Sequence, residues 1–181
     1  MNRERTLSEV GSRLPTLSTE IKLVEALLSS RQYHEALEKC ADLRARYPRS
    51  PSVFWIQASV KGHLKDFSGA VDDLSEVIKL QPDEPRGYFM RGWDLLQLKR
   101  SALAIDDFTE VLRLSKLWES NYYVEAAYFC RAEALVRCRR FREARQDCMH
   151  VSDGFTGWSD SLRSKEAILA DCDAGERSGK G

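Results

Sequence analysis

One phrase occurs twice in this chain, at a spacing of 34 residues. Residues 70–80 read AVDDLSEVIKL and residues 104–114 read AIDDFTEVLRL; six of the eleven positions are identical and the other five exchange similar side chains. The apolar residues of each copy recur with the period of an α-helix and do not alternate as in a strand. The spacing therefore predicts a helical unit that is repeated along the chain, with neighbouring units stacked to bury their apolar faces.

The same pattern can be followed into the neighbouring stretches. Counting from Pro51, a large residue stands at position 4, small residues at 8 and 20, an aromatic at 17, apolar residues at 24 and 27, and a proline at 32. The large residue is Phe54, the small residues are Ala58 and Ala70, and the aromatic is Phe67. The apolar residues are Leu74 and Val77, and the proline is Pro82. Weaker copies begin at Leu17, Pro85 and Glu125. This set of positions resembles the tetratricopeptide repeat, a two-helix unit of 34 residues.

The resemblance implies an all-α fold, a right-handed α-solenoid of stacked antiparallel helix pairs. The first helix of each pair would line a concave face and the second would face outward. At least about three such units are needed for a stable stack, because none can bury its apolar face alone. We expect four repeats, near residues 17–50, 51–84, 85–118 and 125–158.

The remaining segments are assigned by their composition. The insertion 119–124 (ESNYYV) either lengthens the first helix of the fourth unit or forms a longer loop. In residues 158–172 the apolar side chains recur with the period of a helix and polar side chains stand between them. This pattern predicts a capping helix over the open end of the stack. We expect residues 173–181 to be a disordered tail, and residues 1–16 to be loose or a partial helix.

The overall composition excludes several classes of protein. The 28 basic and 28 acidic residues cancel, so no global field draws the chain to nucleic acid or to a membrane. No apolar run approaches the length of a membrane span, and the N-terminus lacks the apolar core of a signal peptide. The odd number of cysteines, with no CxxC pair, favours reduced thiols. We therefore expect a cytoplasmic protein.

The sequence offers no convincing catalytic or metal site, and we expect no enzyme activity and no cofactor. The paired carboxylates Asp72–Asp73 and Asp106–Asp107 fall at equivalent positions of second helices, which predicts a solvated convex face. Cys138, Cys148 and His150 lack the spacing of a zinc site. These residues are better explained by the helical repeat than by chemistry.

The concave face is the predicted binding site. In the family that the sequence resembles, positions 2, 5, 9, 12 and 13 of each first helix point into the groove. The expected groove residues of the last three units are Trp55, Ser59, His63, Arg86, Phe89, Trp93, Gln97, Phe129, Glu133 and Arg137. Those of the first unit are Ile21, Glu25, Leu28 and Ser29, and Tyr122 and Tyr123 are expected on the rim of the groove. Aromatic and arginine side chains often dominate binding energy, so the groove suits a partner polypeptide. Alternatively, the aromatic residues pack against neighbouring helices or under the C-terminal helix.

The expected function is therefore protein–protein interaction by a monomer, for example as an immunity protein that neutralises a toxin or as a secretion chaperone. The basic clamp that some family members use for acidic C-termini is absent, because Ile21, Glu25, Trp55 and Ser59 occupy its positions. One alternative is a scaffold that self-associates. Another is an RNA-binding accessory subunit that uses the arginine-rich stretch Arg131–Arg145, although nucleic acid is the less favoured partner.

Overall fold

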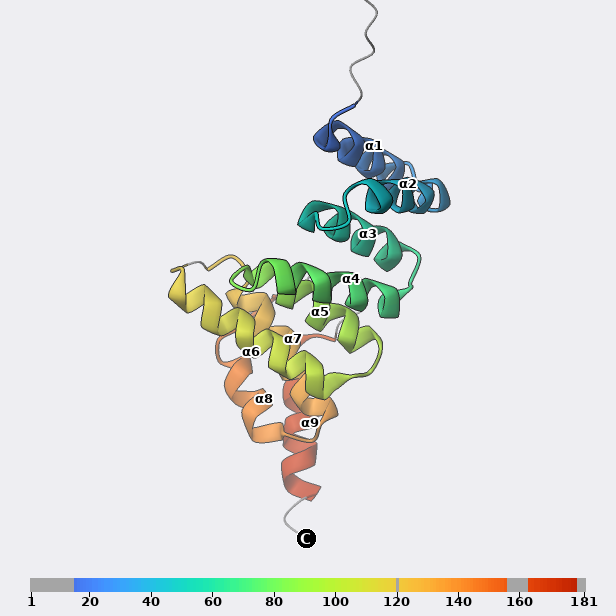
Figure 1. The fold of residues 1–181 in the computed structure, drawn as a ribbon. Helices are drawn as coiled ribbons and strands as arrows, with labels where there is room; N and C mark the ends of the chain where they lie inside the picture. The colour runs from blue at the N-terminus through green and yellow to red at the C-terminus, as the bar shows by residue number, and fades with distance from the viewer. Residues whose placement is uncertain (1–14, 120, 156–162, 179–181) are drawn as a thin grey trace, which may run out of the picture.

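The computed structural model describes residues 15–119, 121–155 and 163–178, and in these residues it contains nine α-helices and no strand. Eight helices form four antiparallel pairs, and the ninth follows the last pair (Figure 1). Their bounds are α1 Leu17–Ser29, α2 Tyr33–Arg46, α3 Pro51–His63, α4 Phe67–Leu80, α5 Pro85–Gln97, α6 Ser101–Leu117, α7 Val124–Arg137, α8 Phe141–Cys148 and α9 Lys165–Ser178. The all-α solenoid predicted from the sequence is confirmed.

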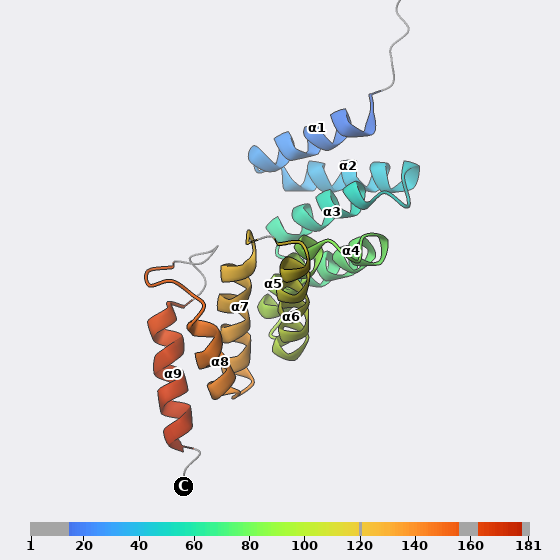
Figure 2. The ribbon, with the colours of Figure 1, turned by 90° about the vertical axis from the view of Figure 1, so that its left-hand side faces the viewer.

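The helices stack in chain order, so that α1 and α9 lie at opposite ends of the array (Figures 1 and 2). Each helix packs against the next one. The first helix of a unit also contacts the first helix of the following unit at three steps of the stack, between α1 and α3, α5 and α7, and α7 and α9. Helix α9 therefore takes the place that the first helix of a fifth unit would occupy, which is the place of a capping helix.

The turn inside each pair has the same backbone geometry in every unit. Arg31, Lys65, Lys99 and Arg139 have φ values of 59–61°, in the left-handed region, and stand at the same position of their repeats. This geometry lets the amide of the left-handed residue and the amide of the next residue bond back to the end of the first helix. In the first unit, Arg31 donates to the carbonyl of Leu28 at 3.0 Å and Gln32 donates to the carbonyl of Leu27 at 2.8 Å. Identical turns give every unit the same antiparallel pairing.

Ion pairs between helices contradict one prediction about the convex face. Asp73 and Asp107 were expected in solvent but are buried, whereas Asp72 and Asp106 are exposed. The second helix of a unit is contacted by its own partner helix and by the first helix of the next unit, so its exposed stripe is narrower than the sequence pattern suggested. Only the outer carboxylate of each pair reaches water.

The buried carboxylates form a bond pattern that is repeated between units. Arg91 on α5 makes a bidentate pair with Asp107 on α6, with N–O distances of 2.7 and 2.9 Å, and donates to Ser75 Oγ on α4 at 3.1 Å. One unit later, Arg131 binds Asp147 at 2.7 and 2.8 Å, and its remaining nitrogen donates to Thr109 Oγ1 on α6 at 2.9 Å. Each arginine thereby joins its own helix pair to the preceding unit. In the unit that starts at Pro51, Lys61 and Arg44 supply the positive charges to Asp73.

The apolar core is divided at the junction between the second and third units. One cluster fills α1, α2 and α3, and a larger one extends from α5 to α9. Between them lies a small cluster of Ala58, Ala70 and Leu74, with Trp55 and Met90 packed against it. Helices α3 and α5 make few direct contacts with each other, so this junction leaves space beside the small cluster.

The C-terminal elements differ from the sequence prediction in extent. Helix α9 overlaps the predicted capping helix over residues 165–172, but it continues to Ser178, so residues 173–178 are helical and not a disordered tail. The predicted start at residue 158 lies outside the described residues. Helix α8 is short and ends at Cys148. The described residues 119 and 121–123 of the insertion lie between α6 and α7, and its last residue, Val124, is the first residue of α7.

In the part of the chain that the structure describes, no helix combines the length and apolarity that crossing a membrane requires.

Candidate functional site

A groove of about 930 Å³ runs along the first helices of the first two units. Most of the residues that line it belong to α1 and α3, and Arg86 at the start of α5 also lines it. The residues that line it are Leu17, Ser18, Ile21, Lys22, Glu25, Leu28, Ser29, Ser52, Trp55, Ile56, Ser59, His63 and Arg86. The predicted groove positions of these two units, together with Arg86, all lie in this surface. We call it the N-terminal groove.

Trp55 is the largest side chain in the N-terminal groove, and it is half-buried. The Arg86 guanidinium carbon lies 4.4 Å from the Trp55 ring centroid, within the range of a cation–π contact. His63 is exposed on the last turn of α3, where its Nδ1 lies 2.8 Å from the carbonyl oxygen of Ser59 and its ring lies against Tyr33. The groove therefore presents an aromatic face with exposed polar groups beside it.

A second, smaller pocket of about 230 Å³ opens beside the groove, between α3 and α5. It shares Trp55, Ser59, His63 and Arg86 with the groove. Its other lining residues are Ala58, Gly62, Phe67, Leu74, Met90, Trp93 and Asp94. The predicted groove residue Trp93 thus belongs to this pocket, where it also packs against the larger core cluster. We call this space the Asp94 pocket.

Asp94 was not singled out from the sequence, but it is the most unusual group in the site. Its side chain lines the pocket and the residue is only 6 % exposed. Burial raises the pKa of Asp94 to about 7, because the carboxylate has lost water without gaining a compensating charge. A sequence signal was present, since a lone acidic residue interrupts the apolar run around Trp93 and Leu95.

The C-terminal half of the predicted groove is closed by the chain itself, which corrects the expectation for two aromatic residues. Phe89 and Phe129 are 2 % and 1 % exposed and belong to the core. The Phe89 ring lies 5.0 Å from Tyr123, and the Phe129 ring lies 5.3 Å from Phe155 in the segment after α8. The alternative reading, that aromatic residues of this face pack inside the protein, holds for these two.

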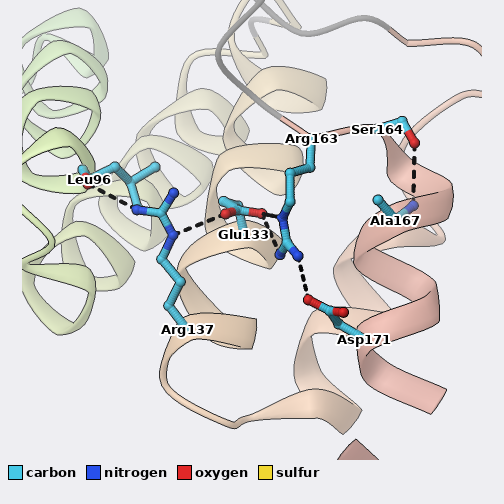
Figure 3. A network of polar contacts seen from close by, with 7 residues as sticks. All are labelled: Leu96, Glu133, Arg137, Arg163, Ser164, Ala167 and Asp171. Carbon is cyan, nitrogen blue, oxygen red and sulfur yellow. Dashed lines mark hydrogen bonds and ion pairs between the residues drawn. The ribbon is translucent and has the colours of Figure 1, made fainter. Parts of the chain in front are cut away.

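Glu133 and Arg137, also expected to face a partner, are engaged in an internal network (Figure 3). Glu133 is 3 % exposed and accepts hydrogen bonds from Arg137 at 3.0 Å and from two nitrogens of Arg163 at 2.9 and 3.1 Å. Arg137 also donates to the carbonyl of Leu96 at 3.0 Å, and Arg163 pairs with Asp171 on α9. Arg163 lies two residues before the start of α9, so this network holds the C-terminal segment over α7.

The remaining predicted site residues lie outside the two cavities. Gln97 is half-buried at the end of α5 and lines neither of them. Tyr122 is 71 % exposed, and its ring stands edge-on against Tyr123 at 4.7 Å. Of the two residues predicted on the rim, one is therefore exposed and the other covers Phe89.

The arginine-rich stretch Arg131–Arg145 is largely neutralised by acidic partners. Four of its six arginines form ion pairs. These pairs are Arg131 with Asp147, Arg137 with Glu133, Arg140 with Glu143, and Arg145 with Asp173. Arginines held in this way offer little free charge to a phosphate backbone.

The cysteines occupy core positions. Cys40, Cys130 and Cys148 are at most 1 % exposed, and burial raises the pKa of these thiols to between about 11 and about 12. Such thiols stay protonated at neutral pH and are poor nucleophiles. In the described residues no three His, Cys, Asp or Glu side chains are grouped so as to hold a metal ion, and His150 stacks on Tyr128.

Comparison with known proteins places the fold. No family model and no curated protein matches the sequence. Among solved structures, the crystal structure of MamA superimposes with a TM-score of 0.75 at 11 % identity, covering 88 % of this chain and 82 % of that one. YrrB, described as a TPR protein with an unusual peptide-binding site, gives 0.71 at 16 % identity over 87 % and 76 %.

A third structure, the TPR2B domain of yeast Sti1 in a complex with pHsp70, gives a TM-score of 0.59 at 15 % identity. It covers 65 % of this chain and 94 % of that domain. At these identities the likeness concerns the fold. Together with the stacked helix pairs described above, it establishes that the chain has the fold of a tetratricopeptide-repeat protein.

Proposed function

We propose that the chain is a protein-interaction module that binds a segment of one partner polypeptide in the N-terminal groove. The observation that carries the proposal is the groove itself, an open surface along α1 and α3 that no other part of the described chain covers. It contrasts with the equivalent surface of α7, where Phe155 and Arg163 lie over the first helix. Of the solved structures with the same fold, YrrB is described as having a peptide-binding site, and the Sti1 TPR2B domain forms a complex with pHsp70.

The side chains of the groove suggest how the partner is held. Trp55, Ile21 and Leu28 provide an apolar surface, while Glu25 and Arg86 lie at its edges. Aromatic anchors surrounded by polar groups are typical of the residues that contribute most to binding. The groove lacks a cluster of basic residues at the clamp positions, so we do not expect a C-terminal carboxylate to be the main contact.

Trp55→Ala tests the proposal, with Trp118→Ala as the control. Trp118 is 61 % exposed and lines a different surface beside Leu80, so the control removes an exposed indole elsewhere. Pull-downs from native lysate with each variant, quantified by mass spectrometry, should show the specific partner lost by Trp55→Ala and kept by Trp118→Ala. Removing such an anchor costs about 2 kcal/mol or more, roughly a thirtyfold loss of affinity. Equal capture by both variants would contradict the assignment.

We further propose that the module acts as a monomer in the cytoplasm, either as an immunity protein that occludes a toxin or as a chaperone of a secreted client. The balanced charge of the chain and the N-terminal groove support a one-to-one complex. Co-expression with the product of the neighbouring open reading frame, followed by light scattering, measures the stoichiometry. Concentration-dependent self-association of the chain alone would favour a scaffold instead.

A further inference from the structure

Asp94 differs from the other buried acidic residues of the described chain. Asp73, Asp107, Glu133 and Asp147 are all at least 95 % buried, and each is paired with a lysine or an arginine. Asp94 is 94 % buried, yet its carboxyl takes part in no hydrogen bond or ion pair within the described part of the chain. A buried carboxylate without a partner is costly, and structures rarely retain one without a reason.

The surroundings of Asp94 are suited to a cation. Its pocket is lined by two indoles, those of Trp55 and Trp93, and by the apolar side chains of Phe67, Leu74 and Met90. Aromatic faces attract ammonium and guanidinium groups, and the methylene stem of lysine or arginine packs well on apolar walls. A carboxylate at the wall of such a pocket completes a site for one long cationic side chain.

The pocket opens into the N-terminal groove, so a bound polypeptide can reach it. Trp55, Ser59, His63 and Arg86 line both spaces. Arg86 and His63 are the other charged or titratable groups that line the pocket. In this structure both are exposed, the Arg86 guanidinium lies over Trp55, and neither forms an ion pair with Asp94.

We propose that the Asp94 pocket receives one lysine or arginine side chain of the partner polypeptide, with Asp94 as its counter-ion. The inference rests on the proposed function, since it assumes that the groove holds a polypeptide. Charge complementarity is the argument for this occupant. The carboxylate then gains an ion pair that the described part of the free chain does not give it, and the bound cation exchanges its water for an aromatic wall. The partner is thereby predicted to contain a basic residue that enters the pocket while the flanking residues lie along α1 and α3.

The direct test uses three small probes of equal backbone: Nα-acetyl-lysine amide, Nα-acetyl-arginine amide and the uncharged Nα-acetyl-norleucine amide. Each is titrated into the full chain at a pH above the pKa of Asp94, and the indole N–H signals of Trp55 and Trp93 are followed by NMR, with Trp118 as an internal reference. We expect the two cationic probes to shift both signals and norleucine amide to bind at least tenfold more weakly. Equal binding of norleucine amide would overturn the proposal, because the pocket would then be a purely apolar site.

Two variants assign the effect to the carboxylate. Asp94→Asn keeps the shape of the side chain and should weaken the cationic probes at least tenfold. Asp72→Asn makes the same change at an exposed carboxylate of α4 that lines neither the groove nor the pocket, and it should change their affinity less than twofold. Thermal unfolding confirms that both variants are folded. Unchanged affinity in Asp94→Asn, or equal losses in both variants, would overturn the proposal.

A random peptide library selected on the wild-type chain separates this inference from the proposed function. Peptides that depend on Trp55, carry a basic residue and lose affinity in Asp94→Asn support both. Peptides that depend on Trp55 but bind Asp94→Asn equally overturn the pocket inference and leave the function standing. If the cationic amides bind through Asp94 while no peptide binds, the proposed function of the groove is overturned. The proposal that the cation comes from a partner polypeptide is then overturned as well.

Discussion

Replacing Asp94 by asparagine should stabilise the free protein above about pH 7 and change its stability little near pH 4. Burial raises the pKa of Asp94 from its ordinary value of 3.8 to about 7 in the folded protein. Between these two pH values the folded state keeps a proton that the unfolded state has released. The free energy of unfolding of the wild type therefore falls as the pH rises through this window, and the loss is complete above the folded-state pKa.

The magnitude follows from the size of the pKa change. At about 1.4 kcal/mol per pKa unit, the shift of Asp94 corresponds to a loss of at most about 4 kcal/mol. This is a large part of the about 5–15 kcal/mol that stabilises a typical domain. The asparagine does not ionise, so the variant escapes this loss. The cost of burying its amide is the same at every pH.

Urea denaturation of both proteins from about pH 4 to about pH 8 measures the effect. The quantity of interest is the difference in unfolding free energy between variant and wild type, because all other titrating groups cancel in it. The difference should grow with pH and level off above about pH 7. A difference that stays constant across this range would refute the reasoning, since Asp94 would then have an ordinary pKa and therefore a partner or water that the structure does not show.

Three further changes test other parts of the structure. Asp107→Asn removes the partner of the half-buried Arg91 and should lower the free energy of unfolding by about 3 kcal/mol in urea; no change would contradict the role of the pair in joining units. Gly175→Ala would place a Cβ 2.1 Å from the Phe141 ring, so α9 should loosen and its amides should exchange with solvent faster, whereas unchanged exchange would argue against this packing. Lys99→Gly relieves a left-handed backbone at φ 59° and should raise the unfolding free energy by about 0.5–1 kcal/mol in thermal melts; a decrease would mean that the lysine side chain matters.

The fold could be predicted because residues of the same kind recur at equivalent positions of several repeats. Small residues recur where helices cross, and Ala70 and Ala104 are both fully buried in the structure. Prolines at positions 51 and 85 begin α3 and α5, where a missing amide hydrogen costs nothing. A period of this kind fixes which helices are neighbours, and the neighbours fix the stack.

The site was predicted only in part, because the sequence does not say where the chain folds back on itself. The groove positions of α1 and α3, such as Trp55, do line an open surface. The same positions in α7 are covered, since the segment after α8 has no repeat period and gave no indication that Phe155 and Arg163 would lie there. Because Phe155 covers it, Phe129 is a core residue and not a groove residue.

The charges were the least predictable feature. Helical periodicity assigned Asp107 to solvent. Arg91 and Arg131, however, stand 40 residues apart in the sequence, and so do their partners Asp107 and Asp147. This matched spacing could have revealed the ion pairs. Asp94 has no repeated counterpart of this kind. Its importance depends on the absence of a partner for its carboxyl among the residues that the structure describes, and that can only be seen once the packing is known.

Hydrogen–deuterium exchange of the full chain with the tightest peptide from the library tests the central claim most directly. We predict that the peptide slows exchange in α1, α3 and α5, and leaves α7 and α9 unchanged. Slowed exchange confined to α7 and α9, or to the outward-facing second helices, would contradict the assignment of the N-terminal groove as the binding site.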